Sequence, residues 1–262
     1  MIASERLLAV PHAVNLRELG GYPAQNGQQI RWRKVLRSGT LFDLTPADGQ
    51  LLVDYGVIKV IDLRSDSETT AMPDRLPHQI AFQQAAVYPF TDQPSPWAKL
   101  ARRIKAKFVV PYDLMLETYL KMLTDSHAIA AFRAVFAALL ANTQPDQAVL
   151  FHCMAGKDRT GMAALMIEGA LGVPEDILRE DYLLTNLVLA RQNAVTNDEL
   201  RHGGSALVNE MNRYQAETTN YQAVHDLVQR RFGSWREYVE KAVGLSRQDL
   251  ADLDRLYLED QR

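Results

Sequence analysis

The only cysteine of the chain, Cys153, shares one polar loop with Arg159, and five residues separate the two. Apolar residues 148–151 run into this loop and apolar residues 162–167 follow it, which predicts a buried strand, a turn and a helix. Backbone N–H groups in such a turn can converge on an anion, and the helix N-terminus adds its positive dipole end. The loop therefore has the composition of a phosphate-binding cradle.

The same positive field would stabilise the thiolate of Cys153, because cysteines at helix N-termini beside cations ionise more readily than free cysteine. Arg159 can bind two phosphoryl oxygens through its planar guanidinium and remains charged throughout. An inert core cysteine is the alternative interpretation. The strand, the helix, Gly156, the Arg159 spacing and the hydroxyl of Thr160 coincide here, which favours a nucleophile.

The stretch His152-Cys153-x-Ala155-Gly156-Lys157-Asp158-Arg159-Thr160-Gly161 resembles the phosphate loop of the cysteine-dependent protein tyrosine phosphatases, especially the bacterial atypical dual- and triple-specificity branch. Weaker similarities cover Asn15-x-Arg17-x-Leu19-Gly20-Gly21, Arg37-Ser38-Gly39, Ile61-Asp62-Leu63-Arg64-Ser65 and the helical tail after Gly233. The resemblance implies action on phosphotyrosine, and often on phosphoserine, phosphothreonine or phosphoinositides. It also implies phosphate or another oxyanion in the loop.

The residues suggest a two-step reaction in which Cys153 attacks phosphorus and water then hydrolyses the phosphocysteine. Arg159 would hold the equatorial oxygens together with the loop residues Met154, Ala155, Gly156, Lys157 and Thr160. His152 is expected to support the shape of the loop, and Thr160 to donate to the Cys153 sulfur. Neither a metal nor a cofactor is expected.

The general acid is predicted to be Asp158, because an aspartate at this loop position is a proposed acid in the resembling family. Asp92 and Asp113 are alternatives, although each is also typical of a turn or a helix start. A Trp-Pro-Asp motif, which carries the acid in the usual tyrosine phosphatases, is absent from the sequence.

Two further cations bear on the substrate. Lys157 would suit a substrate with more than one phosphate, such as a phosphoinositide, or could bind solvent or a structural carboxylate instead. Arg64 could clamp the substrate, as in the resembling family, or pair with Asp66 or Glu68 at a helix start.

Two other functions compete with a phosphatase. Rhodanese-like sulfur transfer is disfavoured, because its loop is usually shorter and Thr160-Gly161 after the arginine fits a phosphatase better. A non-catalytic phosphate-binding module commonly lacks the cysteine, the arginine or the acid, and all three residue types are present here.

Composition favours one domain over residues 1–262, with helical insertions near 95–110 and 195–219. The net charge of −3 does not suggest nucleic-acid binding. The basic segment 97–108 could contact a membrane surface or cover an anionic substrate, or be a solvated helix face. Residues 1–10 do not form a convincing signal peptide, so the cytoplasm is the expected location, with non-classical secretion left open. The oligomeric state is not predicted.

The order of elements predicts an α/β three-layer sandwich with a mainly parallel sheet and a helical C-terminal portion. Short extended pieces are expected within 13–42, and strands at 57–63, at 80–88 and from Ala148 to the loop. Thr45, Pro46 and Gly56 delimit the first helix. The other expected helices are 113–123, 126–140, 159–171, 175–194, 221–232, 235–243 and 247–257, and Ser65-x-x-Glu68 opens a further helical segment.

Overall fold

A mostly parallel sheet forms the centre of the computed structural model, which describes residues 6–92, 111–191 and 216–261. Its strand order is β1 (Arg17–Glu18), β3 (Val35–Ser38), β6 (Ala148–His152), β4 (Val57–Asp62) and β5 (Ala81–Gln84). The four strands β3, β6, β4 and β5 are parallel, and β1 is an antiparallel edge strand. The predicted sheet type is therefore confirmed.

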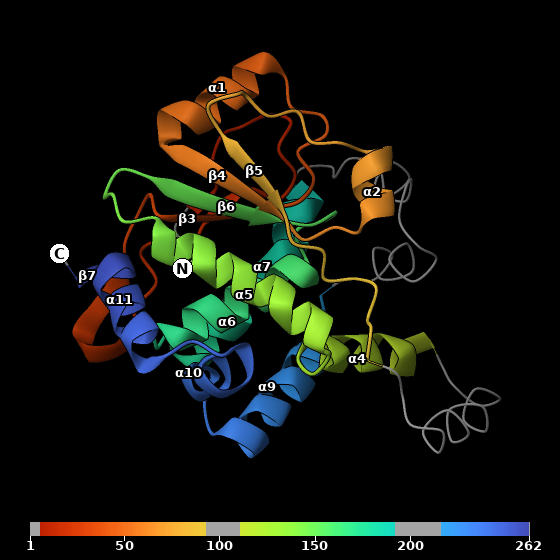
Figure 1. Cartoon of the computed structure of the whole chain (residues 1–262), viewed down its shortest axis with the longest axis vertical. Helices are drawn as coiled ribbons and strands as arrows, with labels where there is room; N and C mark the ends of the chain where they lie inside the picture. The colour runs from red at the N-terminus through yellow and green to blue at the C-terminus, as the bar shows by residue number, and fades with distance from the viewer. Residues whose placement is uncertain (1–5, 93–110, 192–215, 262) are drawn as a thin grey trace.

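Alternate side chains of β6 enter two different hydrophobic cores, as expected for a strand buried on both faces. Val149 and Phe151 belong to the larger core, whereas Ala148 and Leu150 pack in the smaller one with Leu52 of α1 (Pro46–Tyr55). Figure 1 shows α1 on one side of the sheet and most other helices on the opposite side. The three layers match the predicted sandwich.

The helices of the larger core occupy most of the second half of the chain. In order they are α4 (Pro111–Met122), α5 (Ser126–Ala141), α6 (Arg159–Ala170), α7 (Glu175–Arg191), α9 (Thr218–Phe232), α10 (Trp235–Tyr238) and α11 (Arg247–Tyr257), with a π-helical turn at Val239–Val243. A small sheet of β2 (Gln28–Ile30), preceded by a 3-10 turn (Gln25–Gly27), and β7 (Leu258–Asp260) joins the C-terminal end to the early hairpin region. The helical C-terminal portion is thus confirmed.

Local sequence signals explain the limits of α1. The Thr45 hydroxyl accepts a hydrogen bond from the backbone N–H of Asp48, and Pro46 occupies the first turn. Gly56 ends the helix with a φ of 105°, which glycine tolerates without steric cost. The helix has the predicted bounds because all of its start and stop signals are local.

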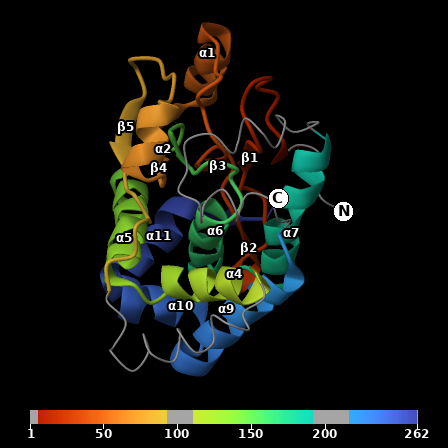
Figure 2. The ribbon, with the colours of Figure 1, turned by 90° about the vertical axis from the view of Figure 1, so that its right-hand side faces the viewer.

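The strand register brings the functional loops to one edge of the sheet. His152 lies opposite Ser38 of β3 on one side and opposite Asp62 of β4 on the other. The carboxyl ends of parallel strands are where open sheets bind ligands. Figure 2 faces this edge, with α2 (Asp66–Ala71) on one side and α7 on the other.

Some predicted bounds differ from the structure. The strand expected at 80–88 is limited to Ala81–Gln84, which pairs with β4 up to the last residue of β4, Asp62. Beyond it, the N–H groups of Ala85 and Val87 still donate to the carbonyls of Asp62 and Leu63. Thr218 already begins α9, so residues 218 and 219 are helical. The predicted insertion at 95–110 and the basic segment 97–108 lie outside the described residues, as does most of 195–219. No single helix in the described ranges has the length and apolarity of a membrane span, although the bent pair Met115–Met122 and Ser126–Ala141 reaches both together.

Candidate active site

The loop from Cys153 to Asp158 joins β6 to α6, and each of its residues is buried. Gly156 has a φ of 66°, and a Cβ at this position would lie 2.6 Å from the carbonyl oxygen of Ser38. A side chain would therefore clash with the backbone of the Arg37-Ser38-Gly39 segment. Gly156 is needed both for its dihedral angle and for this close approach.

Three donors hold the carbonyl groups of the loop. Asn15 Nδ2 donates to the carbonyls of Ala155 (3.1 Å) and Gly156 (3.0 Å), and Arg37 Nη2 also donates to Gly156 (3.0 Å). The backbone N–H of Thr40 donates to Met154 at 2.8 Å. In a trans peptide unit the N–H group points away from the C=O group. These anchors therefore turn the N–H groups of residues 155–157 away from Asn15, Arg37 and Thr40, as an anion nest requires.

The anchoring side chains are themselves fixed by Asp181 of α7. Arg17 Nε donates to Asp181 Oδ1 at 3.1 Å, Arg37 forms an ion pair with Asp181 Oδ2, and Arg17 Nη1 donates to Asn15 Oδ1 at 2.5 Å. Burial alone would raise the pKa of Asp181, but the two arginines outweigh it and lower the pKa to about 2. The two N-terminal motifs thus orient the phosphate loop.

Arg159 projects from the first turn of α6 and forms a bidentate ion pair with Glu68 of α2. Its Nη1 and Nη2 lie 2.7 and 2.8 Å from the two carboxylate oxygens. Burial alone would lower the pKa of Arg159, but Glu68 and, more weakly, the charge of Cys153 raise it. A guanidinium has five N–H groups, and within the described ranges Arg159 donates only to Glu68. The remaining N–H groups can bind an anion beside Cys153.

Glu68 is a functional residue that sequence reasoning missed. Its Oε2 accepts hydrogen bonds from the backbone N–H of Ser65 (2.9 Å) and the Ser65 hydroxyl (2.7 Å), as the capping pattern predicts. Burial alone would raise the pKa of Glu68, but Arg159 and the Ser65 bonds hold it below its usual value. Glu68 therefore stays ionised and orients Arg159. The capping pattern was the available signal, and it explained Glu68 locally without pointing to Arg159.

Asp158, the predicted general acid, stands at the N-cap position of α6 beside two groups that contact its carboxylate. The Tyr119 hydroxyl of α4 donates to Oδ1, and Lys157 Nζ lies 3.5 Å from Oδ2. The Tyr182 hydroxyl of α7 donates in turn to Tyr119 at 2.9 Å. Tyr119 and Tyr182 come from helices distant in sequence, so no residue pattern near Asp158 indicates that they contact it.

The similarity of the whole chain to known proteins now bears on this site. A sequence profile described as the tyrosine phosphatase family matches residues 8–259, nearly the full length. The chain belongs to the tyrosine phosphatase family.

Among the chain's relatives in the tyrosine phosphatase family is a protein of Cupriavidus necator, provisionally named a tyrosine-protein phosphatase. It is 33% identical over 68% of this chain, and this chain spans 63% of its length. A tyrosine-protein phosphatase of Nostoc commune is 29% identical over 88% of this chain and 76% of its own. The triple specificity protein phosphatase PtpB of Mycobacterium tuberculosis is 27% identical over 68% of each chain.

The histidine that precedes Cys153 is held by carboxylates. His152 Nε2 lies 2.9 Å from Asp74 Oδ2 and 3.8 Å from Asp62 Oδ1, and its Nδ1 lies 3.2 Å from the carbonyl oxygen of Cys153. Burial alone would lower the pKa of His152, but Asp74 and Asp62 outweigh it and raise the pKa. These contacts of His152 agree with the prediction that it supports the shape of the phosphate loop.

Arg64 lies in the same carboxylate cluster, away from the partners that the sequence suggested. It forms ion pairs with Asp62 and Asp74, both at 2.8 Å, rather than with Asp66 or Glu68. Nη1 donates to Thr40 Oγ1 (3.1 Å) and to the carbonyl of Met72 (2.9 Å). Because these bonds and those of Nε to Asp62 occupy the guanidinium, Arg64 does not have a free face to clamp a substrate in this structure.

Three further residues singled out in the sequence are Thr160, Asp92 and Asp113. The Thr160 hydroxyl lies 3.4 Å from the carbonyl oxygen of Ser38, a long contact, and its donation to the Cys153 sulfur stays a prediction. Asp92 accepts hydrogen bonds from the backbone N–H (3.0 Å) and hydroxyl (2.6 Å) of Ser126, so it binds the first residue of α5 from a distant loop. Asp113 lies in the first turn of α4, and its side chain is outside the described part.

One group in the described ranges has the spacing of a metal site. Ligand atoms of Asp62, Asp74 and His152 lie within 4.8 Å of one another. The guanidinium of Arg64 already binds both carboxylates at 2.8 Å. A metal ion at this position would have to displace an arginine, so we assign the cluster to loop support.

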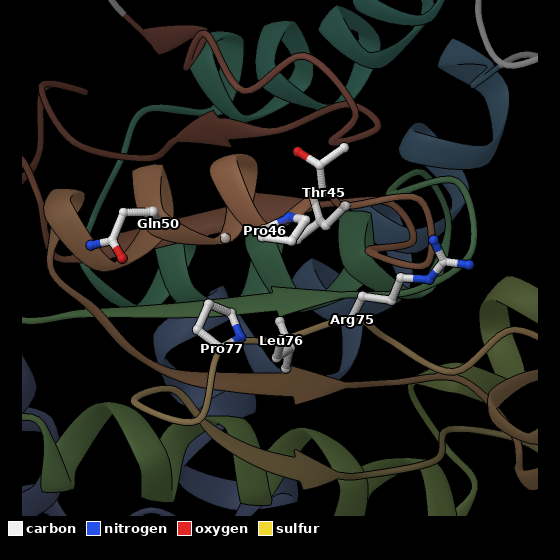
Figure 3. A pocket seen from close by; sticks show the side chains of 8 residues that line it. Thr45, Pro46, Gln50, Arg75, Leu76 and Pro77 are labelled. Atoms are coloured by element: carbon white, nitrogen blue, oxygen red, sulfur yellow. The ribbon is translucent and has the colours of Figure 1, made fainter.

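A groove of about 430 Å³ lies between α1 and the segment Arg75–Pro77. Figure 3 shows Thr45, Pro46 and Gln50 on one side and Arg75, Leu76 and Pro77 on the other. None of its lining residues belongs to the phosphate loop. The groove is therefore separate from the predicted chemistry.

Proposed function

We propose that this chain is a cysteine-dependent phosphatase that hydrolyses phosphotyrosine, and also phosphoserine and phosphothreonine, through a phosphocysteine intermediate. The observation that carries this proposal is the Arg159–Glu68 pair beside Cys153, which leaves further N–H groups of Arg159 for phosphoryl oxygens. Family membership supports the reaction class. The name of the mycobacterial relative, a triple specificity phosphatase, supports the wider substrate range.

In the first step the Cys153 thiolate attacks phosphorus in line with the leaving oxygen. The S–P bond forms as the ester P–O bond breaks, and Asp158 gives its proton to the leaving oxygen. Arg159 and the loop N–H groups bind the equatorial oxygens while their charge redistributes. Positioning and electrostatic stabilisation of this kind supply most of the catalysis in phosphoryl transfer.

In the second step a water molecule attacks the phosphocysteine. The carboxylate of Asp158 accepts a proton from that water as the new P–O bond forms and the S–P bond breaks. Inorganic phosphate leaves, the Cys153 thiolate is restored, and Asp158 is again protonated for the next cycle. Atoms and charge therefore balance without another reactant.

Two other predictions remain alternatives to this function. A phosphoinositide substrate rests on Lys157, whose Nζ already has a carboxylate at 3.5 Å, that of the candidate acid Asp158. A non-catalytic binding module would need an inactive site, although the cysteine, the arginine and the candidate acid are all present. Neither alternative has a specific contact in its favour, and membrane contact through 97–108 stays a prediction.

Phosphate release from a substrate panel tests the proposed function. The panel holds phosphotyrosine, phosphoserine and phosphothreonine peptides and mono- to trisphosphorylated phosphoinositides, without added metal. We expect release from the phosphotyrosine peptide by the wild type and a loss of about 10⁴-fold or more in Cys153→Ser, as for other covalent nucleophiles. Release from phosphoinositides alone would favour the lipid alternative. Binding without release would favour the binding module.

The role of Asp158 is tested by the leaving group. Asp158→Asn should slow hydrolysis of a phosphotyrosine peptide by about 10²-fold or more, because its leaving oxygen needs a proton. An aryl phosphate with a strongly acidic phenol should lose far less activity. Steady-state kinetics of both esters make the comparison, and equal losses would remove Asp158 as the acid.

A further inference from the structure

Two tyrosines form a directed chain of hydrogen bonds that ends on the candidate acid. Asp158 as a carboxylate can only accept, so the Tyr119 hydroxyl must donate to its Oδ1. A phenol has one hydrogen, and Tyr119 has then used it. The bond of 2.9 Å between Tyr182 and Tyr119 must therefore be donated by Tyr182. The chain runs from Tyr182 through Tyr119 to Asp158.

Both tyrosines are held in place within the larger core. Each is only 1% exposed, and their rings meet edge to face with centroids 6.4 Å apart. Burial first, and the charge of Asp158 second, raise the pKa of both phenols above the usual value. The two hydroxyls therefore remain protonated at working pH and act as fixed donors rather than as proton-transfer groups.

The contact distinguishes the two oxygens of the carboxylate. Oδ1 is occupied by the Tyr119 hydrogen, whereas Oδ2 faces Lys157 Nζ at 3.5 Å. A proton that Asp158 transfers would then be carried on Oδ2. Asp158 accepts no backbone N–H of its own helix, so Tyr119 is the neutral donor that fixes its rotamer.

We infer that Tyr119, oriented by Tyr182, is a positioning residue that fixes Oδ1 of Asp158 and leaves Oδ2 to exchange protons with leaving group and water. This inference rests on the proposed function of Asp158. A hydrogen bond to the ionised form favours that form. Loss of the Tyr119 hydroxyl would therefore remove both the hold on the carboxylate and a bond that favours its charged form. Simple packing of α4 against α7 would predict neither effect.

The test uses the variant Tyr119→Phe, which keeps the buried ring and removes the hydroxyl. The readout is kcat/KM against pH, because this ratio includes the acid-assisted step and reports the free enzyme. Without the donor, the charged form of the Asp158 carboxylate loses this hydrogen bond. The alkaline limb of the kcat/KM profile for a phosphotyrosine peptide should therefore move to higher pH by about one pH unit.

The leaving-group dependence gives a second readout for the same variant. At its optimum, Tyr119→Phe should lose roughly tenfold in kcat/KM on the phosphotyrosine peptide, because a carboxyl group free to rotate is misplaced. An ester with an acidic phenol should be almost unaffected. Tyr182→Phe should shift the limb in the same direction by less, since Tyr119 can still donate.

Tyr221→Phe is the matched control. Its ring continues the same aromatic row, with its centroid 6.0 Å from that of Tyr182, but its hydroxyl donates to the carbonyl of Glu175 at 3.1 Å. The control should keep the wild-type limb. An unchanged limb in Tyr119→Phe, or an equal shift in Tyr221→Phe, would overturn the inference. If Tyr119→Phe does not fold, the alkaline limb of the kcat/KM profile of Tyr182→Phe is the test. A limb at the wild-type pH in that variant counts against the inference.

Asp158→Asn separates this inference from the proposed function. If Asp158→Asn abolishes the alkaline limb and Tyr119→Phe leaves it in place, only the positioning role fails. If Asp158→Asn keeps the limb, Asp158 is not the acid and the proposed function itself needs another one.

Discussion

Arg64 and Arg159 are both buried arginines that follow neighbouring parallel strands, yet their surroundings differ in kind. Arg64 follows β4 and pairs with Asp62 and Asp74, and further bonds to Thr40 and Met72 occupy its guanidinium. Arg159 follows β6, and in the described ranges its only carboxylate partner is Glu68. The two residues are of the same type and both buried, so they differ in the number of their hydrogen-bond partners. Arg64 has all of its donors occupied, whereas Arg159 keeps donors for a ligand.

The balance of charge around each arginine also differs. A buried charge is costly unless it is paired and hydrogen-bonded. At Arg64 two carboxylates exceed one guanidinium, and His152 lies beside them with a raised pKa. At Arg159 one carboxylate balances one guanidinium, so in the proposed reaction a phosphoryl group would add negative charge where N–H donors remain. We therefore assign structure to Arg64 and anion binding to Arg159.

The largest expected difference between the two arginines is in activity. Arg159→Lys should lower kcat/KM on a phosphotyrosine peptide by about 10²–10³-fold, because a lysine cannot hold Glu68 and two phosphoryl oxygens with one planar group. The free energy of unfolding should change less, since the positive charge beside Glu68 is kept. Steady-state kinetics and urea unfolding of the same preparation provide both numbers.

Arg64→Lys is the matched comparison. It should lose of the order of 3 kcal/mol in unfolding free energy, because removal of one partner's bonds leaves buried carboxylates poorly paired. Activity per folded molecule should fall by no more than about tenfold. If Arg64→Lys instead lost as much activity as Arg159→Lys at unchanged stability, the contrast between structural and ligand-binding arginines would be wrong.

A smaller effect is expected in the pH dependence of stability around Arg64. Burial alone would lower the pKa of His152, but Asp74 and Asp62 raise it, so its contribution is complete below about 6.5 and is lost as pH rises through the folded pKa. Burial alone would raise the pKa of Asp74, but His152 and Arg64 lower it. Its contribution is therefore present above about 3.9 and is lost as pH falls.

The variant Asp74→Asn removes the main charge that raises the pKa of His152. Urea midpoints of the wild type should decline from about pH 6 toward pH 8 more steeply than those of Asp74→Asn. The variant should also be less stable throughout, since Arg64 loses one carboxylate. Parallel curves for the two proteins over this range would show that His152 and Asp74 are not linked in the folded state.

Local signals made most elements predictable from the sequence. Thr45, Pro46 and Gly56 gave the bounds of α1, and the polar loop after Ala148–His152 gave the strand-to-helix turn. The position of the phosphate loop followed from Gly156 and Arg159. Each of these depends on residues within one or two turns of one another.

Contacts between residues far apart in the sequence could not be predicted in the same way. Arg159 and Glu68 are 91 positions apart, and Glu68 already had a local explanation as a capping residue. Asn15 lies 140 positions from the carbonyl that it holds. Arg64 was ambiguous because Asp66 and Glu68 are near it in sequence, whereas the chain returns to place Asp74 beside it. Only the packed sheet edge selects among such partners.

The central claim is that Cys153 carries the phosphoryl group, and the most direct test is to trap it. Wild-type protein is mixed with a labelled phosphotyrosine peptide, denatured within milliseconds, digested and analysed by mass spectrometry, with Cys153→Ser in parallel. We predict label on Cys153 in the wild type, and neither label at this position nor turnover in the variant. Label on another residue, or substantial turnover by Cys153→Ser, would contradict the account.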